Sequence, residues 1–261
     1  MVEAKTQRIA VLSDVHGNLE ALTSVLADVD AQGATEIIGL GDMVGYGPEP
    51  EACVRLLRER GVPTVLGNHE HGLVEALARG WFNPQAKRAL DRTRQLLSDD
   101  SLMYFRTLPR TLTAHGALFV HGCPPGLVSR YLYELDEEGL REAFTLYDNA
   151  LCFCGHTHEL ERVSLTPGAR GGKGRLVRRG LGKGLLTLDG NTRHIVTAGS
   201  VGQPRDGNNK AKYLLWEPAQ ENSGTKADIR IEVRFVPYDI ARTAARIVEV
   251  GLPTVYADRL W

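Results

Sequence analysis

Cysteine is scarce in this sequence, with four residues in 261, and so is net charge, which is −1 at pH 7. Four cysteines are too few for a disulfide scaffold, and Cys152 and Cys154 stand too close in an extended segment to bridge comfortably. The near-zero net charge gives no general reason to expect nucleic acid or a membrane as a partner. No apolar run has the length of a signal peptide or a membrane span. We therefore expect reduced thiols and a cytoplasmic location.

What the chain has instead is an ordinary globular composition, 43% hydrophobic and 24% charged, which suits one large domain or two small ones. The first part of the chain alternates strand and helix patterns from "RIAVLSD" to "PTVLGNH", which predicts parallel strands with right-handed crossovers. The pattern is helical from Glu70 to Thr107, and short strands then dominate up to a last helix predicted at "DIARTAARIVEVG". No repeat or linker separates domains, so we expect a single α/β domain over residues 1–261.

Polar residues collect where the apolar runs end. In open α/β sheets, ligands bind beyond the carboxyl ends of the strands. Five of the eight histidines follow such runs, together with two aspartates and two asparagines. Mixed imidazole and carboxylate ligands suit transition metals such as manganese, iron or zinc better than calcium. The residues at these ends are Asp14, His16, Asn18, Asp42, Asn68, His69, His121, His156 and His158.

The stretch "CFCGHTH" also suggests a structural zinc site, because Cys152, Cys154, His156 and His158 stand at every second position. Side chains two apart on a strand are separated by roughly 6.5–7 Å. Four such steps cannot close a tetrahedron with bonds of about 2 Å unless the chain bends sharply. We therefore interpret the two cysteines as small buried hydrophobic residues of a strand.

The motifs DxHGN, GDxVGYGPxP, GNHE, HG and GHTH, in this order, resemble those of the calcineurin-like metallophosphoesterases. The resemblance runs from Ile9 to Tyr213 and is greatest to the small bacterial branch, for which "GSVGQPRDG" (199–207) is also typical. It implies two sheets packed face to face and flanked by helices, with a dinuclear metal site at the strand ends. The implied ligands are Asp14, His16 and His158 for one metal, Asn68, His121 and His156 for the other, and Asp42 as the bridge between them.

The resemblance implies a phosphoesterase with two divalent transition-metal ions, drawn from manganese, iron, zinc and nickel, with manganese favoured. Two metals about 3.5–4 Å apart lower the pKa of a shared water and clamp the phosphoryl oxygens for in-line attack, so a metal-bridging hydroxide would be the nucleophile. His69 would assist the leaving group as a general acid. Asn18 and Arg205 are candidates for holding a phosphate oxygen, or else local turn or surface residues.

One departure from the family bears on the substrate. Its protein phosphatases and dinucleoside polyphosphate hydrolases carry an arginine in the loop after the bridging aspartate, where this chain has Gly45, Tyr46 and Gly47. We therefore expect hydrolysis of phosphodiesters, with phosphomonoesters as further substrates. The alternatives are those two activities of the same family and, outside the enzymes, a non-catalytic scaffold of this fold. The expected partner is a small phosphorylated molecule, nucleotides included, and the sequence predicts no oligomeric state.

Two further segments carry predictions. The helical segment 70–107 is a candidate for a cap over the substrate, with Trp81, Phe82 and Tyr104 as an aromatic face or as core residues. The glycine-rich basic segment 168–184 is either a solvated hairpin or an electrostatic lure for anionic substrates, hanging near the metal site. Its basic residues are Arg170, Lys173, Arg175, Arg178, Arg179 and Lys183.

Overall fold

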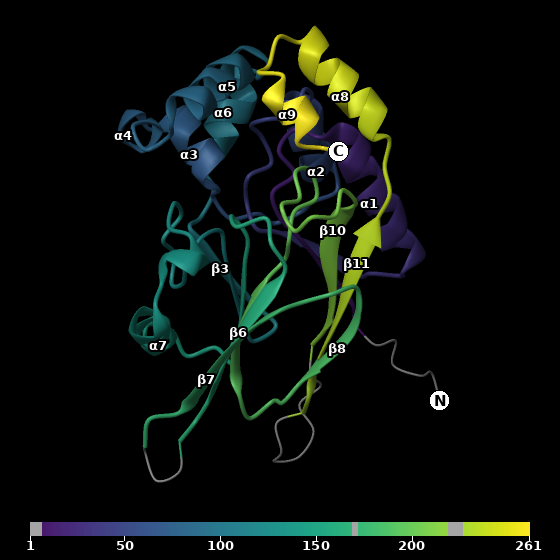
Figure 1. Cartoon of the computed structure of the whole chain (residues 1–261). Coiled ribbons are helices and arrows are strands. Elements are labelled where there is room, and N and C mark those ends of the chain that lie inside the picture. The colour runs from purple at the N-terminus through teal and green to yellow at the C-terminus, as the bar shows by residue number, and fades with distance from the viewer. Residues whose placement is uncertain (1–6, 169–171, 219–226) are drawn as a thin grey trace.

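The computed structural model describes residues 7–168, 172–218 and 227–261. Two sheets form its centre, and helices lie outside them and across one end (Figure 1). This is the predicted α/β arrangement of two sheets flanked by helices, which is confirmed. Within the described ranges, none of the helices is both long enough and apolar enough to cross a membrane.

The first sheet combines the start of the chain with its last strands. In spatial order its described strands are β2 (Glu36–Gly39), β1 (Ile9–Leu12), β10 (Ala211–Glu217), β11 (Ile229–Val236) and β8 (Gly184–Leu188). The pair β1 and β2 is parallel, as predicted, and the remaining pairs are antiparallel. The third strand predicted in this part of the chain, at "PTVLGNH", is reduced to a single parallel bridge between Gly39 and Thr64.

The second sheet contains the middle of the chain. In spatial order its described strands are β3 (Thr111–Ala114), β4 (Ala117–Val120), β5 (Leu151–Cys154), β9 (Arg193–Thr197), β6 (Glu161–Thr166) and β7 (Arg175–Gly180). The three central strands β4, β5 and β9 are parallel. Their carboxyl ends therefore meet at one edge of the sheet, and His121 and His156 follow there.

Strand β1 shows how the sheets share the core. Ile9 and Val11 pack between the two sheets, in the same apolar cluster as Phe119 of β4. Ala10 and Leu12 point the other way, into the core that contains the buried face of the first helix. Successive side chains of a strand alternate between faces, so both faces of β1 are buried and its sequence is apolar throughout.

The helices cover the outer faces of the sheets and one end of the sandwich (Figure 1). The helical pattern predicted for 70–107 is present as four short helices, and the predicted C-terminal helix is present as well. The described α-helices are α1 (Leu19–Ala31), α2 (Pro50–Glu59), α3 (Asn68–Val74), α4 (Ala76–Arg79), α5 (Pro84–Gln95), α6 (Asp99–Phe105), α7 (Glu137–Thr145), α8 (Ile240–Glu249) and α9 (Val255–Asp258).

The C-terminal helices connect two other regions. Ile247 of α8 and Tyr256 of α9 form an apolar cluster with Ala89 of α5, and Tyr46 packs against the same cluster. The Arg92 side chain of α5 also donates a hydrogen bond to the Val250 carbonyl at 2.5 Å. The C-terminal helices α8 and α9 thus pack against both the helical segment 70–107 and the loop after β2.

Candidate metal centre

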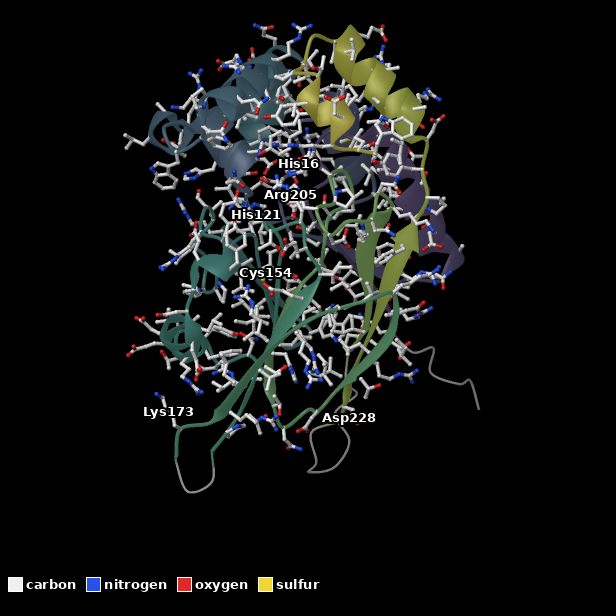
Figure 2. All side chains as sticks on the ribbon, in the orientation of Figure 1. His16, His121, Cys154, Lys173, Arg205 and Asp228 are labelled. Carbon is white, nitrogen blue, oxygen red and sulfur yellow. The ribbon has the colours of Figure 1, made fainter. Side chains whose placement is uncertain are left out.

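The predicted metal ligands meet at one end of the sandwich, where Figure 2 shows His16 and His121 close to Arg205. Ligand atoms within 4.8 Å of one another form three overlapping groups of buried side chains. The amide oxygen of Asn68 lies 3.0 Å from Nε2 of His121, which adds the remaining predicted ligand. The groups are Asp14, His16 and His158; His16, Asp42 and His69; and Asp42, His121 and His156.

The backbone at these residues is strained. Asp14, His16, Asp42, His156 and His158 all have positive φ, between 49° and 66°. For a residue with a Cβ this left-handed conformation costs about 1–3 kcal/mol, and such residues cluster at functional sites. The strain brings the side chains that follow each strand to one point, so it identifies this end of the sandwich independently of the residue types.

Hydrogen bonds between loops hold this backbone in place. The His16 N–H donates to the Asp42 carbonyl at 2.9 Å, and the Gly202 N–H donates to the Asp14 carbonyl at 2.9 Å. The carboxylate of Glu70, which is fully buried, accepts from the N–H groups of Asp42 and of Gly67 at 2.9 and 3.1 Å. Glu70 was not predicted as a site residue, although it is the last letter of the GNHE motif. It ties the loop after β2 to the start of α3.

The histidine tautomers follow from their backbone partners. Nδ1 of His16 lies 3.1 Å from the Val44 carbonyl, Nδ1 of His121 lies 2.7 Å from the Leu40 carbonyl, and Nδ1 of His158 lies 2.5 Å from the Gln203 carbonyl. A carbonyl oxygen only accepts hydrogen bonds, so each Nδ1 carries the proton. In the neutral imidazole, Nε2 is then an unprotonated acceptor, which is the arrangement typical of a metal ligand.

Imidazole nitrogens of two histidine pairs face each other across short gaps. Nε2 of His16 lies 3.0 Å from Nε2 of His158, and Nε2 of His121 lies 3.2 Å from Nδ1 of His156. In the first pair both Nε2 atoms are acceptors, and two lone pairs repel at this distance unless a cation lies between them. Two nitrogens bound to one zinc-like ion at about 2.1 Å stand about 3.0–3.4 Å apart for right-angle to tetrahedral geometry. The spacing of both pairs fits one divalent cation each.

The pKa values of the buried site residues and their unpaired polar atoms also indicate a cation site. Burial lowers the pKa of His156 to about 3 and that of His158 to about 4, so both are neutral ligands at pH 7. Burial would raise the pKa of Asp42, but the neighbouring histidines, His121 first, hold it well below its usual range. Oδ1 of Asp14 and Nε2 of His156 are buried without a hydrogen-bond partner among the described residues. A bound cation would satisfy the Asp14 oxygen and balance the buried carboxylates.

Asp42 lies between the two histidine pairs. Its Oδ2 is 3.7 Å from Nε2 of His16 and 3.4 Å from Nε2 of His121. Its other oxygen, Oδ1, accepts the backbone N–H of His69 at 2.9 Å. One oxygen therefore orients the carboxylate, and the other faces both pairs, as the predicted bridge requires.

The predicted acid, His69, is buried beside this carboxylate, with its Nε2 3.9 Å from Oδ2 of Asp42. Its ring makes edge contacts with the rings of Tyr46 and Phe82, at centroid distances of 4.5 and 5.1 Å. Burial lowers its pKa to about 3, so it is a neutral imidazole at pH 7. A Cβ at Gly45 would lie 2.0 Å from Nδ1 of His69, so only glycine fits there.

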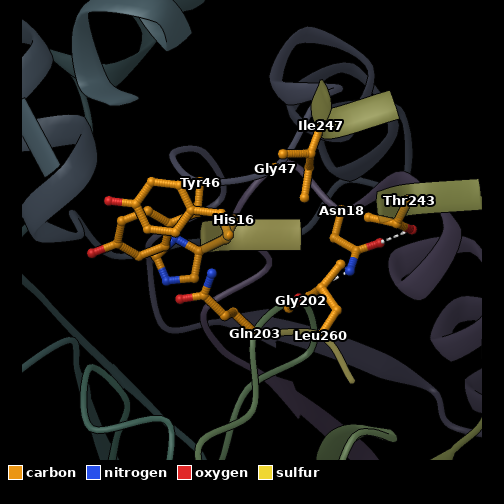
Figure 3. Close-up of a pocket in the computed structure, with 10 residues that line it drawn as sticks. His16, Asn18, Tyr46, Gly47, Gly202, Gln203, Thr243, Ile247 and Leu260 are labelled. Carbon is orange, nitrogen blue, oxygen red and sulfur yellow. Dashed lines mark hydrogen bonds between the residues drawn. The ribbon is translucent and has the colours of Figure 1, made fainter. Parts of the chain in front are cut away.

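Of the two residues considered for phosphate binding, Arg205 is exposed and Asn18 is buried. Asn18 is buried, and its amide caps α1, accepts from the hydroxyl of Thr243 at 3.1 Å and donates to the Gly202 carbonyl at 2.9 Å (Figure 3). These bonds favour the local structural role for Asn18. Arg205 is exposed and forms no ion pair with any residue that the structure describes, and its backbone N–H donates to the His158 carbonyl at 3.3 Å.

The cysteines and the aromatic residues divide between core and site. Cys152 and Cys154 are buried free thiols in the apolar cluster that includes α7, and burial raises the pKa of both. They take no part in the metal centre, as expected. Phe82 contacts His69, whereas Trp81 is 70% exposed and Tyr104 packs on the core with the Arg58 guanidinium over its ring. Phe82 alone among the three aromatic residues reaches the centre.

The basic segment lies elsewhere. Its part "RLVRRG" forms β7, as the hairpin interpretation predicted, but Lys173 lies at the opposite end of the molecule from His16 (Figure 2). The prediction that this segment hangs near the metal site is wrong for its tip. The reason is the direction of β6, which leads away from His158 for six residues before the chain turns back. Arg170 lies outside the described residues.

Comparisons with known proteins agree with this geometry. The family model for the calcineurin-like phosphoesterase superfamily domain matches residues 8–221. An uncharacterized protein of Methanocaldococcus jannaschii is 33% identical over 258 residues, which is 97% of each chain. The crystal structure of a metallophosphoesterase from Sphaerobacter thermophilus is 34% identical, has a TM-score of 0.78 and covers 98% of each chain. A hypothetical protein from Pyrococcus horikoshii, with 18% identity, a TM-score of 0.72 and 97% coverage of each chain, shares the fold.

The matched region contains every strand-end motif from Asp14 to His158, and the residues of those motifs are the ones that converge in the structure. The resemblance inferred from the sequence is therefore confirmed. This chain is a member of the calcineurin-like phosphoesterase superfamily, a family of metal-dependent phosphoesterases.

Proposed function

We propose that this chain is a dinuclear phosphoesterase that hydrolyses phosphodiester bonds, with phosphomonoesters as further substrates. One observation carries the proposal: two pairs of buried imidazole nitrogens, each 3.0–3.2 Å apart, lie on either side of the Asp42 carboxylate. Each pair has the spacing that suits one divalent cation, and the carboxylate lies where both cations would share it.

The same residues divide naturally between two cations. Two such ions, when bound, lower the pKa of a water and offset the charge of the phosphoryl oxygens. Imidazole with carboxylate ligands suits manganese, iron, zinc and nickel, and manganese is the ion we propose to test first. One ion would be held by Asp14, His16 and His158 and the other by Asn68, His121 and His156, with Asp42 shared.

His69 has the position and the protonation state to assist the leaving group. As a neutral imidazole it carries one N–H, which can donate to the oxygen of the departing alcohol. The rings of Tyr46 and Phe82 fix its plane, and the Asp42 carboxylate accepts from its backbone N–H. The backbone of His69 is therefore held by the same carboxylate that lies between the histidine pairs, which keeps the ring beside the proposed cations.

The loop after β2 supports a preference for diesters. A Cβ at Gly45 would meet His69, and a Cβ at Gly47 would lie 2.2 Å from the His16 carbonyl oxygen. The loop is thus packed against the centre and offers no arginine there to grip a doubly charged terminal phosphate. The same loop weakens the protein phosphatase and dinucleoside polyphosphate alternatives. The scaffold alternative has no support in this site, because all seven predicted ligands converge.

The proposal is tested by turnover of bis(p-nitrophenyl) phosphate and of p-nitrophenyl phosphate with manganese added. We expect metal-dependent cleavage of the diester with a kcat/KM at least equal to that for the monoester. A protein that strongly prefers the monoester would overturn the substrate preference. A protein that cleaves neither ester with manganese, iron, zinc or nickel would overturn the activity.

A further inference from the structure

A pocket of about 540 Å³ lies directly beside the candidate metal centre. Three of its lining residues contact proposed ligands: the Tyr46 ring lies 4.6 Å from the ring of His16, the Tyr131 ring stacks on that of His156 at 3.9 Å, and Gln203 accepts from His158. The pocket therefore adjoins the proposed metal ligands. A substrate held at the centre has room to extend into it.

The aromatic rings of this pocket do not offer a free face for a nucleobase. Tyr131 is near-parallel to two rings, His156 at 3.9 Å and Tyr133 at 4.7 Å, with interplanar angles of 13° and 14°. At these distances the two rings would overlap if they stacked on the same face of Tyr131. Each ring therefore covers a different face, and neither face is free. Tyr46 stacks on Tyr256 at 4.6 Å. The tyrosines present hydroxyl groups and edges to the pocket instead.

The charged groups around the pocket are donors. Two arginines line it, Arg205 and Arg259, and the ten lining residues include no carboxylate. Both guanidinium groups are exposed, and neither forms an ion pair with a residue in the described part of the chain. The first turn of the twelve-residue helix α5 also lines the pocket. Its Pro84 has no N–H and its Ala86 N–H donates to Asn83 Oδ1, so the N–H of Gln85 and the helix dipole add partial positive charge there.

The side chain of Gln203 places an unpaired polar atom at the wall of the pocket. It is 2% exposed and lines the pocket, and its Oε1 position has no hydrogen-bond partner among the described residues. A buried amide without partners is costly, and either of its ends can be turned toward a ligand. The amide can therefore present either its oxygen or its NH₂ group beside Arg205.

We propose that this pocket is an anion subsite that binds a second phosphate group of the substrate, with Arg205 and Arg259 as its charged donors. The inference rests on the proposed phosphoesterase function and narrows the substrate class to phosphoesters that carry another phosphate nearby. Guanidinium groups bind phosphate oxygens through paired N–H donors, and two of them with hydroxyl and amide donors match a dianion.

The subsite depends on the C-terminal segment, to which the sequence assigned no role. Tyr256 and Arg259 belong to or follow α9, and the superfamily model matches only residues 8–221. The Arg259 guanidinium lies 5.5 Å from the centre of the Tyr256 ring, which is buried and stacked on Tyr46. The C-terminal segment thereby places the Arg259 guanidinium beside the candidate metal centre, whose proposed ligands all lie between Asp14 and His158.

The test compares two p-nitrophenyl phosphodiesters that differ in one phosphate: p-nitrophenyl propyl phosphate and its 3-phosphonooxypropyl counterpart. The ratio of their kcat/KM values is measured for the wild type, for Arg259→Gln and for Arg246→Gln. Arg246 is a matched control, because it is a partly exposed arginine of α8 that pairs with Glu249 and does not line the pocket. Neither substituted residue is buried, and thermal unfolding checks that each variant is folded.

We expect the wild type to prefer the phosphorylated ester and Arg259→Gln to lower that preference about tenfold, the scale of one charge-assisted hydrogen bond. Arg246→Gln should keep the wild-type ratio. An unchanged ratio in Arg259→Gln, or an equal loss in Arg246→Gln, would overturn the subsite even if both esters are cleaved.

A binding measurement separates this inference from the activity. Calorimetric titration of inorganic phosphate into the metal-free protein needs no turnover. We expect about tenfold weaker binding to Arg259→Gln than to Arg246→Gln. If neither ester is cleaved but this difference is found, the phosphoesterase proposal fails and the anion subsite stands. Equal phosphate binding by both variants overturns the subsite.

Discussion

The candidate metal centre and the hairpin of β6 and β7 lie at opposite ends of the sandwich (Figure 2). They differ in whether their charged side chains are buried. At the metal centre, Asp14 and Asp42 are fully buried beside histidines. In the hairpin, Arg175 and Arg179 are exposed, and Arg178 forms two 2.7 Å hydrogen bonds with Glu161. Exposed charges cost little to keep, whereas buried charges persist only where partners or cations compensate them. Burial and convergence, and not the density of charge along the chain, mark the functional end.

Replacing the shared carboxylate should break the metal end most severely. We expect Asp42→Asn to abolish turnover and to release at least one metal ion while the protein stays folded, because two close cations would lose their common negative charge. Metal analysis, an activity assay and a thermal melt measure the three effects. Asp99→Asn, at a side chain that is 95% exposed, is the control and should match the wild type. Full activity with two ions in Asp42→Asn would contradict the proposed bridge.

Removing the proposed acid should affect chemistry and leave metal content unchanged. We expect His69→Ala to lower kcat by about 10²–10⁴-fold, the usual range for a positioned acid or base. The loss should be smaller for p-nitrophenolate than for an alkoxide leaving group, because a good leaving group needs less assistance. Steady-state kinetics on a pair of such esters, with metal analysis, test this. Equal losses for both leaving groups would mean that His69 has another role.

A single methyl group can test how closely the loop after β2 is fitted to His69. We expect Gly45→Ala to lower kcat about tenfold or more with metal content retained, since its Cβ would lie 2.0 Å from the imidazole. Gly33→Ala is the matched control, because Gly33 also has positive φ but a Cβ there meets no atom within 4 Å. Kinetics and thermal melts of both variants separate the clash from the backbone cost. Identical behaviour of the two variants would contradict the proposed fit.

The smallest effect is expected at the hairpin. Changing Lys173, Arg175 and Arg179 together to glutamine should alter kcat/KM by less than about twofold at 0.1 M salt, where charges more than about 10 Å apart are screened. Arg178 is left in place because its pair with Glu161 joins β6 to β7. A large decrease that fades as salt rises would show that this end steers substrate after all.

Local pattern accounts for much of the fold and most of the centre. The apolar runs of β1, β2 and β5, with polar residues directly after them, placed Asp14, Asp42 and His156 at strand ends. The strand expected at "PTVLGNH" failed because pairing depends on a neighbour in space, and Thr64 finds only one bridge. The interpretation of periodicity cannot detect that competition.

The parts that could not be predicted depend on contacts between distant segments. Asn18 was considered for phosphate, but its amide is used by Gly202 and Thr243, which lie far along the chain. Tyr131 and Tyr256 carry no local signal, since a tyrosine outside a motif is as often core as site. They reach the pocket through the packing of the second sheet and of α9.

The central claim is that the two histidine pairs and Asp42 hold two cations. Diffraction from crystals grown with manganese, recorded near the manganese absorption edge, tests it most directly. Two anomalous peaks about 3.5–4 Å apart are predicted, both in contact with Asp42. One should also contact His16 and His158, and the other His121 and His156. A single peak, no peak, or peaks away from these side chains would contradict the account.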